Sequence, residues 1–236
     1  MGSTRLPGKV MRPLAGMPVI WHVLERVSRI AGLSEVILAT STTPRDDELA
    51  AYVSQVAKVR VVRGPEFDVL DRFAGAVRGL ASDAVVRFTA DCPLLCPSVS
   101  ARVIQRFSQP TTPCDYASNT LTRTFPRGLD TEVIATAALL AAHREATDPY
   151  DREHVTPFVW RHPTRFRLCG VQDQVDRSGY RWTLDTEADY DLIARIYDEL
   201  YPVVRGFDYE EILRCLEAHP EWATINHHVV PNGRVG

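Results

Sequence analysis

The chain has 236 residues, of which 45% are hydrophobic and 24% are charged, a composition typical of a soluble globular protein. Its net charge of −3 gives no general attraction to nucleic acid or anionic membranes, and no apolar run approaches the roughly 20 residues of a membrane span. The five cysteines are scattered, as reduced thiols usually are, and no signal peptide precedes the first motif, so we expect a cytoplasmic protein.

The first nine residues combine glycines, hydroxyls and basic side chains in Met1-Gly2-Ser3-Thr4-Arg5-Leu6-Pro7-Gly8-Lys9. Glycines allow a backbone to approach a ligand closely, and arginine and lysine both suit phosphate oxygens. The stretch predicts a triphosphate-binding loop, with a loose basic tail as the alternative. It is not a P-loop, because the glycine spacing differs and Val10 follows Lys9 where a hydroxyl is needed. Any metal ligands must therefore come from elsewhere in the chain.

Predicted helices and strands alternate over the first half of the chain. The pattern gives a helix at 19–27, a strand at 34–40, a helix at 46–57, a strand at 59–63, a helix at 68–80, a strand at 84–89 and a helix at 98–107. Such alternation is typical of βαβ units around a mostly parallel sheet flanked by helices.

The alternation loosens after about residue 115. We predict strands at 115–119, 129–134, 166–171 and 180–184 and helices at 135–146, 151–160, 188–200 and 209–218, with a kink or a new start at Pro157. A polar, proline-containing excursion covers 120–127. No repeat or linker divides the chain, so we predict a single α/β domain over 1–236 with a lid region at 115–180.

Two aspartates directly follow predicted strands. Asp91 leaves the strand at 84–89, and Asp185 ends the strand at 180–184. Ligands of open parallel sheets bind beyond the carboxyl ends of the strands, and Mg²⁺ takes one or two carboxylates together with phosphate oxygens. The pair therefore predicts a magnesium site, whereas each aspartate alone is also a candidate helix N-cap.

Six blocks in order carry a resemblance over nearly the whole chain. They are Met1–Val10, Val62–Gly64 with Asp68–Phe73, Asp91–Leu94, Thr124–Asp130, Arg152–Pro157 and Arg181–Thr186. Together they resemble the cytidylyltransferases of spore-coat polysaccharide biosynthesis, which are similar to the 3-deoxy-manno-octulosonate and acylneuraminate cytidylyltransferases. The resemblance implies a nucleotide-diphospho-sugar transferase fold, CTP as donor, Mg²⁺, release of pyrophosphate and a homodimer.

The resemblance also assigns roles to residues. It implies phosphate contacts from Gly2, Ser3, Arg5, Gly8 and Lys9, with Arg5 and Lys9 as the catalytic cations, and metal binding by Asp91 and Asp185. The nucleotide would further contact Thr40, Ser41, Asp71 and Arg72. Val69 and Leu70 depart from the octulosonate pattern, so Asp71 and Arg72 match it less closely.

The acceptor pocket is expected in the lid region, which would also form dimer contacts. Its candidate residues are Arg127, Asp130, Glu132, His154 and Arg181. Arginine binds a carboxylate by a bidentate contact, so the expected acceptor is a sugar acid or a related anion such as a phosphonate or polyol phosphate. The alternatives are solvated surface charge for Asp130, Glu132 and Arg152-Glu153, and a hydrogen-bonded core histidine for His154.

Members of the resembled family carry a buried apolar strand just ahead of the opening loop, and this sequence begins inside the loop. We expect its absence to leave an open central position in the sheet with unpaired backbone groups on both sides. Either Met1 is a misassigned start or the chain is impaired, and the first is favoured. Two other functions stay open, namely nucleotidyl transfer from another triphosphate and nucleotide binding without catalysis.

Overall fold

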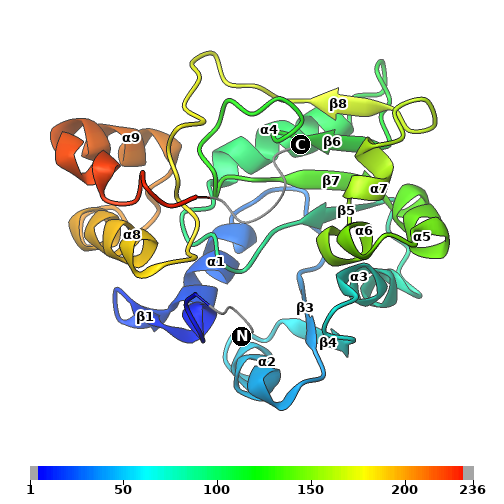
Figure 1. Cartoon of the computed structure of the whole chain (residues 1–236), viewed down its shortest axis with the longest axis horizontal. Coiled ribbons are helices and arrows are strands. Elements are labelled where there is room, and N and C mark those ends of the chain that lie inside the picture. Colours follow the sequence, from blue (N-terminus) through cyan, green and yellow to red (C-terminus); the bar gives the residue numbers. More distant parts are fainter. Residues whose placement is uncertain (1–4, 231–236) are drawn as a thin grey trace.

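The computed structural model describes residues 5–230, so Gly2 and Ser3 lie outside the described residues (Figure 1). The described chain opens with a 3₁₀ turn, η1 (Lys9–Met11), and a short hairpin of β1 (Pro13–Leu14) and β2 (Met17–Pro18). Helix α1 (Val19–Ser28) follows Pro18, whose extended backbone suits a helix start, and buries Val19, Ile20 and Val23. The sequence analysis did not predict the hairpin. The helix predicted at 19–27 is confirmed.

A parallel pair of strands forms the first part of the α/β architecture. β3 (Ile37–Ser41) pairs in parallel with β4 (Arg60–Gly64). The connection between them contains a 3₁₀ turn, η2 (Pro44–Asp46), and helix α2 (Asp47–Gln55). α3 (Val69–Val77) comes next and begins at Asp68, whose side chain accepts the N–H of Asp71. These elements confirm the predicted strand–helix alternation, with ends displaced by a few residues.

A second sheet of four strands has the order β5-β7-β6-β8. The bounds are β5 (Ala84–Arg87), β6 (Tyr116–Ser118), β7 (Glu132–Ala135) and β8 (Leu168–Gly170). β6 and β8 are parallel, but β7 runs antiparallel to both β5 and β6, so this sheet is mixed. Alternation along the strands gives the sheet two apolar faces, with Tyr116 and Ile134 on one and Ala117 and Val133 on the other.

Helices cover both faces of the second sheet. α4 (Pro97–Phe107) packs on the face of Ala117 and Val133, and α5 (Thr136–Glu145) packs on the face of Tyr116 and Ile134 (Figure 1). The single helix predicted at 151–160 is two helices, α6 (Pro149–His154) and α7 (Pro157–Trp160). Of the two expectations for Pro157, a kink or a new helix start, the structure shows the new start.

The C-terminal helices pack around a separate apolar cluster. α8 (Glu187–Leu200), α9 (Tyr209–Ala218) and the 3₁₀ turn η3 (Pro220–Thr224) enclose Trp182 and Leu184, both fully buried. Within residues 5–230, no helix combines the length and the apolar character that crossing a bilayer requires.

The predicted strand at 180–184 is wrong. The segment makes only an isolated bridge, in which Arg127 N–H donates to Tyr180 O and Trp182 N–H donates to Arg127 O. The pairing stops there because Leu184 N–H turns to another acceptor, the carbonyl of Asp91. Gly128 permits the close crossing, since a Cβ at that position would lie 2.5 Å from the Trp182 carbonyl carbon.

The sheet has the open position that the sequence predicted. In the described residues β3 pairs only with β4 and β5 only with β7, so each presents an unpaired edge. A cavity of about 610 Å³ lies between these edges, lined by Leu38 and Ala39 of β3, Val85 and Val86 of β5, Val23 of α1 and Phe73 of α3. Two rows of peptide groups facing an apolar cavity fit the backbone of one more strand.

Supplying that strand should stabilise the protein. A Val/Ile-rich extension of about six residues ahead of residue 1 should raise Tm by about 5–15 °C, because it buries several side chains and about 1 kcal/mol is worth 2–4 °C in a chain of this size. Calorimetry measures the change, with a Ser/Gly-rich extension of equal length as the control. Equal Tm values for the two extensions would show that the cavity does not accept a strand.

Candidate active site

Asp91 and Asp185 lie together at one end of the sheet architecture. A backbone hydrogen bond of 2.8 Å from Leu184 N to Asp91 O ties the two segments to each other. Neither aspartate caps a helix, because the N-cap of α4 is Cys96 and that of α8 is Thr186. The helix-cap interpretation is therefore wrong for both residues.

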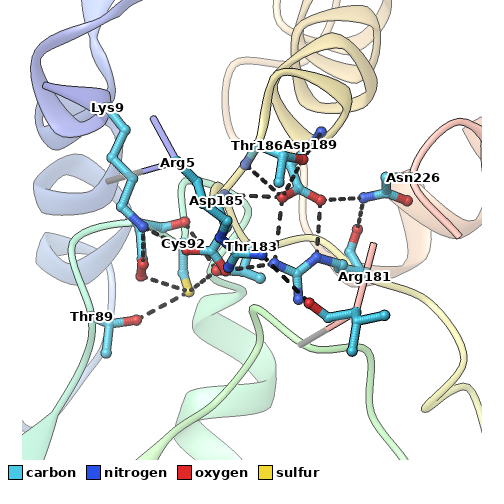
Figure 2. Close-up of polar contacts among 12 residues, drawn as sticks. Arg5, Lys9, Thr89, Cys92, Arg181, Thr183, Asp185, Thr186, Asp189 and Asn226 are labelled. Carbon is cyan, nitrogen blue, oxygen red and sulfur yellow. Dashed lines mark hydrogen bonds and ion pairs between the residues drawn. The ribbon is translucent and has the colours of Figure 1, made fainter. Parts of the chain in front are cut away.

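The ammonium of Lys9 sits between the two carboxylates. Lys9 Nζ lies 2.6 Å from Asp91 Oδ2 and 2.7 Å from Asp185 Oδ1, and the lysine side chain is 13% exposed. Arg5 adds a second cation at 3.4 Å from Asp185 Oδ2. Burial alone would lower the pKa of Lys9, but both carboxylates outweigh it and leave this pKa above its ordinary value. The opening loop and the two aspartates thus form one charged cluster, of which Figure 2 labels Arg5, Lys9 and Asp185.

Arg181 holds Asp185 from the opposite side. Its Nη2 donates to Asp185 Oδ2, and its Nε donates to Asp189 Oδ1 at 3.0 Å (Figure 2). Burial would raise the pKa of Asp185, but Lys9 and Arg181 outweigh it and keep this pKa below its ordinary value. The guanidinium of Arg181 is only 7% exposed, so this geometry favours a positioning role over direct contact with an acceptor.

Asp189 and Asn226 complete this support. Asp189 is fully buried, and its carboxylate accepts the N–H groups of Asp185 and Thr186 at 3.0 and 2.9 Å. Asn226 Nδ2 donates to Asp189 Oδ1 and to Arg181 O, both at 2.8 Å. The sequence prediction lacks both residues. The pattern Thr186-x-x-Asp189 is a capping-box motif that marks the start of α8, but nothing near Asn226 indicates its contact.

The carboxylate pair is suited to a hard divalent cation. Its donors are carboxylate oxygens, which Mg²⁺ prefers, and a positively charged group already lies between them. No group of three or more acidic, histidine or cysteine side chains in metal-binding arrangement occurs among residues 5–230. A metal ion held here would therefore take its other ligands from water and substrate phosphates.

Four of the predicted acceptor residues lie in one neighbourhood beside this cluster. The Arg127 side chain is half-buried and makes no ion pair within residues 5–230, whereas Asp130 pairs bidentately with Arg123 at 2.6 and 2.8 Å. Burial and the nearby Arg123 lower the pKa of Arg127. Arg181 belongs to the same neighbourhood because a backbone bridge joins it to Arg127, and its side chain is paired with Asp185 and Asp189. Arg127 is therefore the cation of this group that has no ion-pair partner among residues 5–230.

Glu132, the remaining member of that neighbourhood, is bound within the protein. It is 7% exposed and accepts hydrogen bonds from Tyr116 at 2.6 Å and Thr156 at 2.5 Å, and it pairs with Arg87. The surface-charge interpretation of Glu132 is therefore wrong. Arg87 is a charged residue at the end of an apolar strand, and a charge in that position usually has a partner of opposite charge.

His154 is half-buried at the end of α6, and its ring lies 4.2 Å from that of Tyr150. No hydrogen bond from its ring is present within residues 5–230, so it is not the hydrogen-bonded core histidine held as the alternative. Burial lowers its pKa. Arg152, in the same helix, pairs with Asp68 at 2.7 Å rather than lying free in solvent.

The residues predicted to contact the nucleotide lie on the β3–β4 side. Thr40 and Ser41 are buried, and their hydroxyls donate to Asp46 Oδ2 at 2.7 and 2.6 Å. Asp71 bonds to His143 at 2.9 Å. Arg72 donates to the carbonyls of Pro65 and Glu66 at 2.9 and 3.0 Å. These side chains shape the loops after β3 and β4, and their contact with a nucleotide stays a prediction.

Comparison with known proteins gives a consistent result. The sequence model of the family described as "Cytidylyltransferase" matches residues 1–216. The spore coat polysaccharide biosynthesis protein SpsF of Bacillus subtilis is 31% identical over 233 residues, with 95% of this chain and 93% of that protein covered. A cytidylyltransferase structure from Leptospira borgpetersenii covers 100% of this chain and 95% of its own at 26% identity, with a TM-score of 0.87. The structure of CMP:2-keto-3-deoxy-manno-octonic acid synthetase with CTP shares the fold at a TM-score of 0.58 and 19% identity, with 84% and 95% covered.

The support behind Asp185 should be sensitive to Asp189. Asp189→Asn should lower the free energy of unfolding by about 3–5 kcal/mol, because it leaves the buried guanidinium of Arg181 without one of its partners. Urea titration measures the loss. Asp191→Asn is the matched control, since Asp191 is 51% exposed and its removal should cost less than about 0.5 kcal/mol. Equal losses in the two variants would contradict the role given to Asp189.

Proposed function

The chain belongs to the cytidylyltransferase family, and from that membership we propose that it transfers CMP from CTP to a sugar acid or related anionic acceptor, with release of pyrophosphate, for glycan or polysaccharide synthesis. The family makes it a nucleotidyltransferase that uses CTP. The acceptor class and the biosynthetic role are the proposed part.

The observation that carries the proposal is the cluster of Lys9, Asp91 and Asp185. It joins the opening loop to two carboxylates, each within 2.7 Å of one ammonium. Phosphoryl and nucleotidyl transfer depend mainly on positioning and on neutralising charge around the phosphorus. The cluster supplies carboxylates that could hold a divalent cation and basic groups that could bind phosphate oxygens, and a triphosphate substrate needs both.

Asp91 and Asp185 would hold Mg²⁺ in this proposal. The ion would supply charge neutralisation on the CTP phosphates. Lys9 and Arg5 lie beside these carboxylates, and their side chains would contact phosphate oxygens. Arg181 and Asp189 would keep the Asp185 carboxylate in place during the reaction.

The reaction is an in-line displacement. An acceptor oxygen attacks the α-phosphorus of CTP and loses its proton to solvent, and the bond from that phosphorus to the bridging oxygen of pyrophosphate breaks. Lys9 and Arg5 stabilise the charge that develops on the phosphate oxygens. No covalent enzyme nucleophile is required. Cys92 is buried beside Asp91, and burial raises the pKa of its thiol well above the ordinary value, which disfavours the thiolate.

Arg127 supports an anionic acceptor. It is half-buried and unpaired among the described residues, and two further guanidinium groups, of Arg123 and Arg181, act on it. Arg123 is already paired with Asp130, and Arg181 with Asp185 and Asp189, so the charge of Arg127 is the one left for an anion to neutralise. A carboxylate or phosphonate of the acceptor would do so, and arginine binds either group by two parallel hydrogen bonds.

Removing one carboxylate should abolish the transfer. Asp91→Asn should lower pyrophosphate release from CTP at least about 100-fold, because it removes a proposed ligand of the Mg²⁺ that would neutralise the phosphates, and it should leave Tm within a few degrees. A coupled pyrophosphate assay over a panel of sugar acids, repeated with ATP, GTP and UTP, measures this. Asp191→Asn should match the wild type. Equal rates in the two variants, or a wild type that is active only with another triphosphate, would contradict the proposal.

Arg127 should affect the acceptor and not the nucleotide. Arg127→Gln should raise the acceptor KM at least about 10-fold and leave the KM for CTP nearly unchanged, because a charged bidentate contact is lost on one substrate only. Arg195→Gln, which alters an exposed arginine on α8, is the control. If both KM values rise together, Arg127 has a structural role instead.

A further inference from the structure

Lys9 occupies the place between the carboxylates that a bound divalent cation would take. Its Nζ is 2.6 and 2.7 Å from one oxygen of each aspartate, and the aspartate side chains are only 24% and 23% exposed. Few carboxylate oxygens are therefore open to an ion that arrives from solvent. The arrangement is an internal ion pair at the proposed metal site.

We propose that Lys9 is an internal counter-cation that keeps divalent metal off the Asp91–Asp185 pair until a nucleoside triphosphate draws the ammonium away. The triphosphate and the metal then bind together, and the metal does not bind first. This inference rests on the proposed function, because it assigns the order in which that site is filled.

Charge makes the two cations mutually exclusive. Asp91 and Asp185 carry two negative charges, and Lys9 with Arg5 supplies two positive charges within 3.4 Å. Arg181 also pairs with Asp185, and Asp189 balances its charge. The carboxylates are thus already neutralised in the free protein. A divalent ion bound to the same oxygens would lie within a few ångströms of the ammonium, and like charges at that range repel strongly in a half-buried site.

The position of Lys9 in the chain allows it to move. Gly8, just before Lys9, has a left-handed backbone with φ of 67°. Val10, just after Lys9, is buried. The base of the lysine is therefore fixed. Its four-carbon stem is flexible and carries a point charge with rotatable donors, so the ammonium can exchange carboxylate for phosphate oxygens without a backbone change.

A triphosphate supplies what metal alone cannot. Its oxygens offer the ammonium new acceptors and, at the same time, offer the divalent ion further ligands. Arg181 does not replace Lys9, because its guanidinium is already divided between Asp189 and the other oxygen of Asp185, Oδ2. The release of Lys9 consequently frees one oxygen of each carboxylate, Asp91 Oδ2 and Asp185 Oδ1.

Metal binding to the nucleotide-free protein tests the inference. We expect Lys9→Met to bind Mn²⁺ at least 10-fold more tightly than the wild type, measured by electron paramagnetic resonance and by calorimetry. The matched control is Lys58→Met, because Lys58 is the other lysine of the sequence and is exposed; it should behave as the wild type. Adding Asp91→Asn to Lys9→Met should remove the gain. Equal Mn²⁺ affinity in the wild type and Lys9→Met would overturn the proposal.

The ammonium itself gives a second test in the unmodified chain. Labelling with ¹⁵N-lysine gives one Nζ resonance for each of Lys9 and Lys58. The Lys9 resonance should shift on addition of CTP with Mg²⁺ and stay in place with Mg²⁺ alone, whereas a shift with Mg²⁺ alone would overturn the inference. If the Mn²⁺ difference holds but no acceptor yields pyrophosphate, the proposed function fails and the ion-pair inference stands.

Discussion

The ion pairs of Lys9 with Asp91 and Asp185 are the constraint on which the site depends. Two carboxylates that share a half-buried position repel each other unless a cation lies between them. Lys9 meets both within 2.7 Å, and the bond from Leu184 N to Asp91 O fixes the two segments beside each other. Three parts of the chain, the opening loop and the segments after β5 and before α8, are joined at this point.

The apolar cluster of the C-terminal helices makes that junction rigid. Trp182 and Leu184 are fully buried on either side of Thr183, so the backbone that leads to Asp185 is anchored by packing. Asp189 of α8 then positions Asp185 in two ways. Its carboxylate accepts the backbone N–H of Asp185, and it also binds Arg181, which in turn binds the Asp185 carboxylate. The Asp185 carboxylate of our proposal is thus positioned by packing and by buried hydrogen bonds.

The sequence predicted most local elements and the residues of the charged cluster, but not the long-range partners that support them. Arg5, Lys9 and Asp91 were identifiable because a Gly/Arg/Lys loop and a carboxylate after a strand have a direct chemical meaning, and Asp185 was identified although the strand expected before it is absent. The strand at 180–184 was wrong because an apolar run shows burial but not which backbone it pairs with. The roles of Asp189 and Asn226 were not predictable for the same reason, because they arise from residues distant in sequence. Arg87 in an apolar strand indicates a buried ion pair but does not identify Glu132 as its partner.

A structure of the complex with CTP and Mn²⁺, with the metal located by anomalous scattering, tests the central claim most directly. The account predicts a metal peak bound by Asp91 and Asp185, with Lys9 Nζ turned from both carboxylates to a phosphate oxygen. A metal ion bound elsewhere, with Lys9 still between the two aspartates and CTP in place, would contradict it.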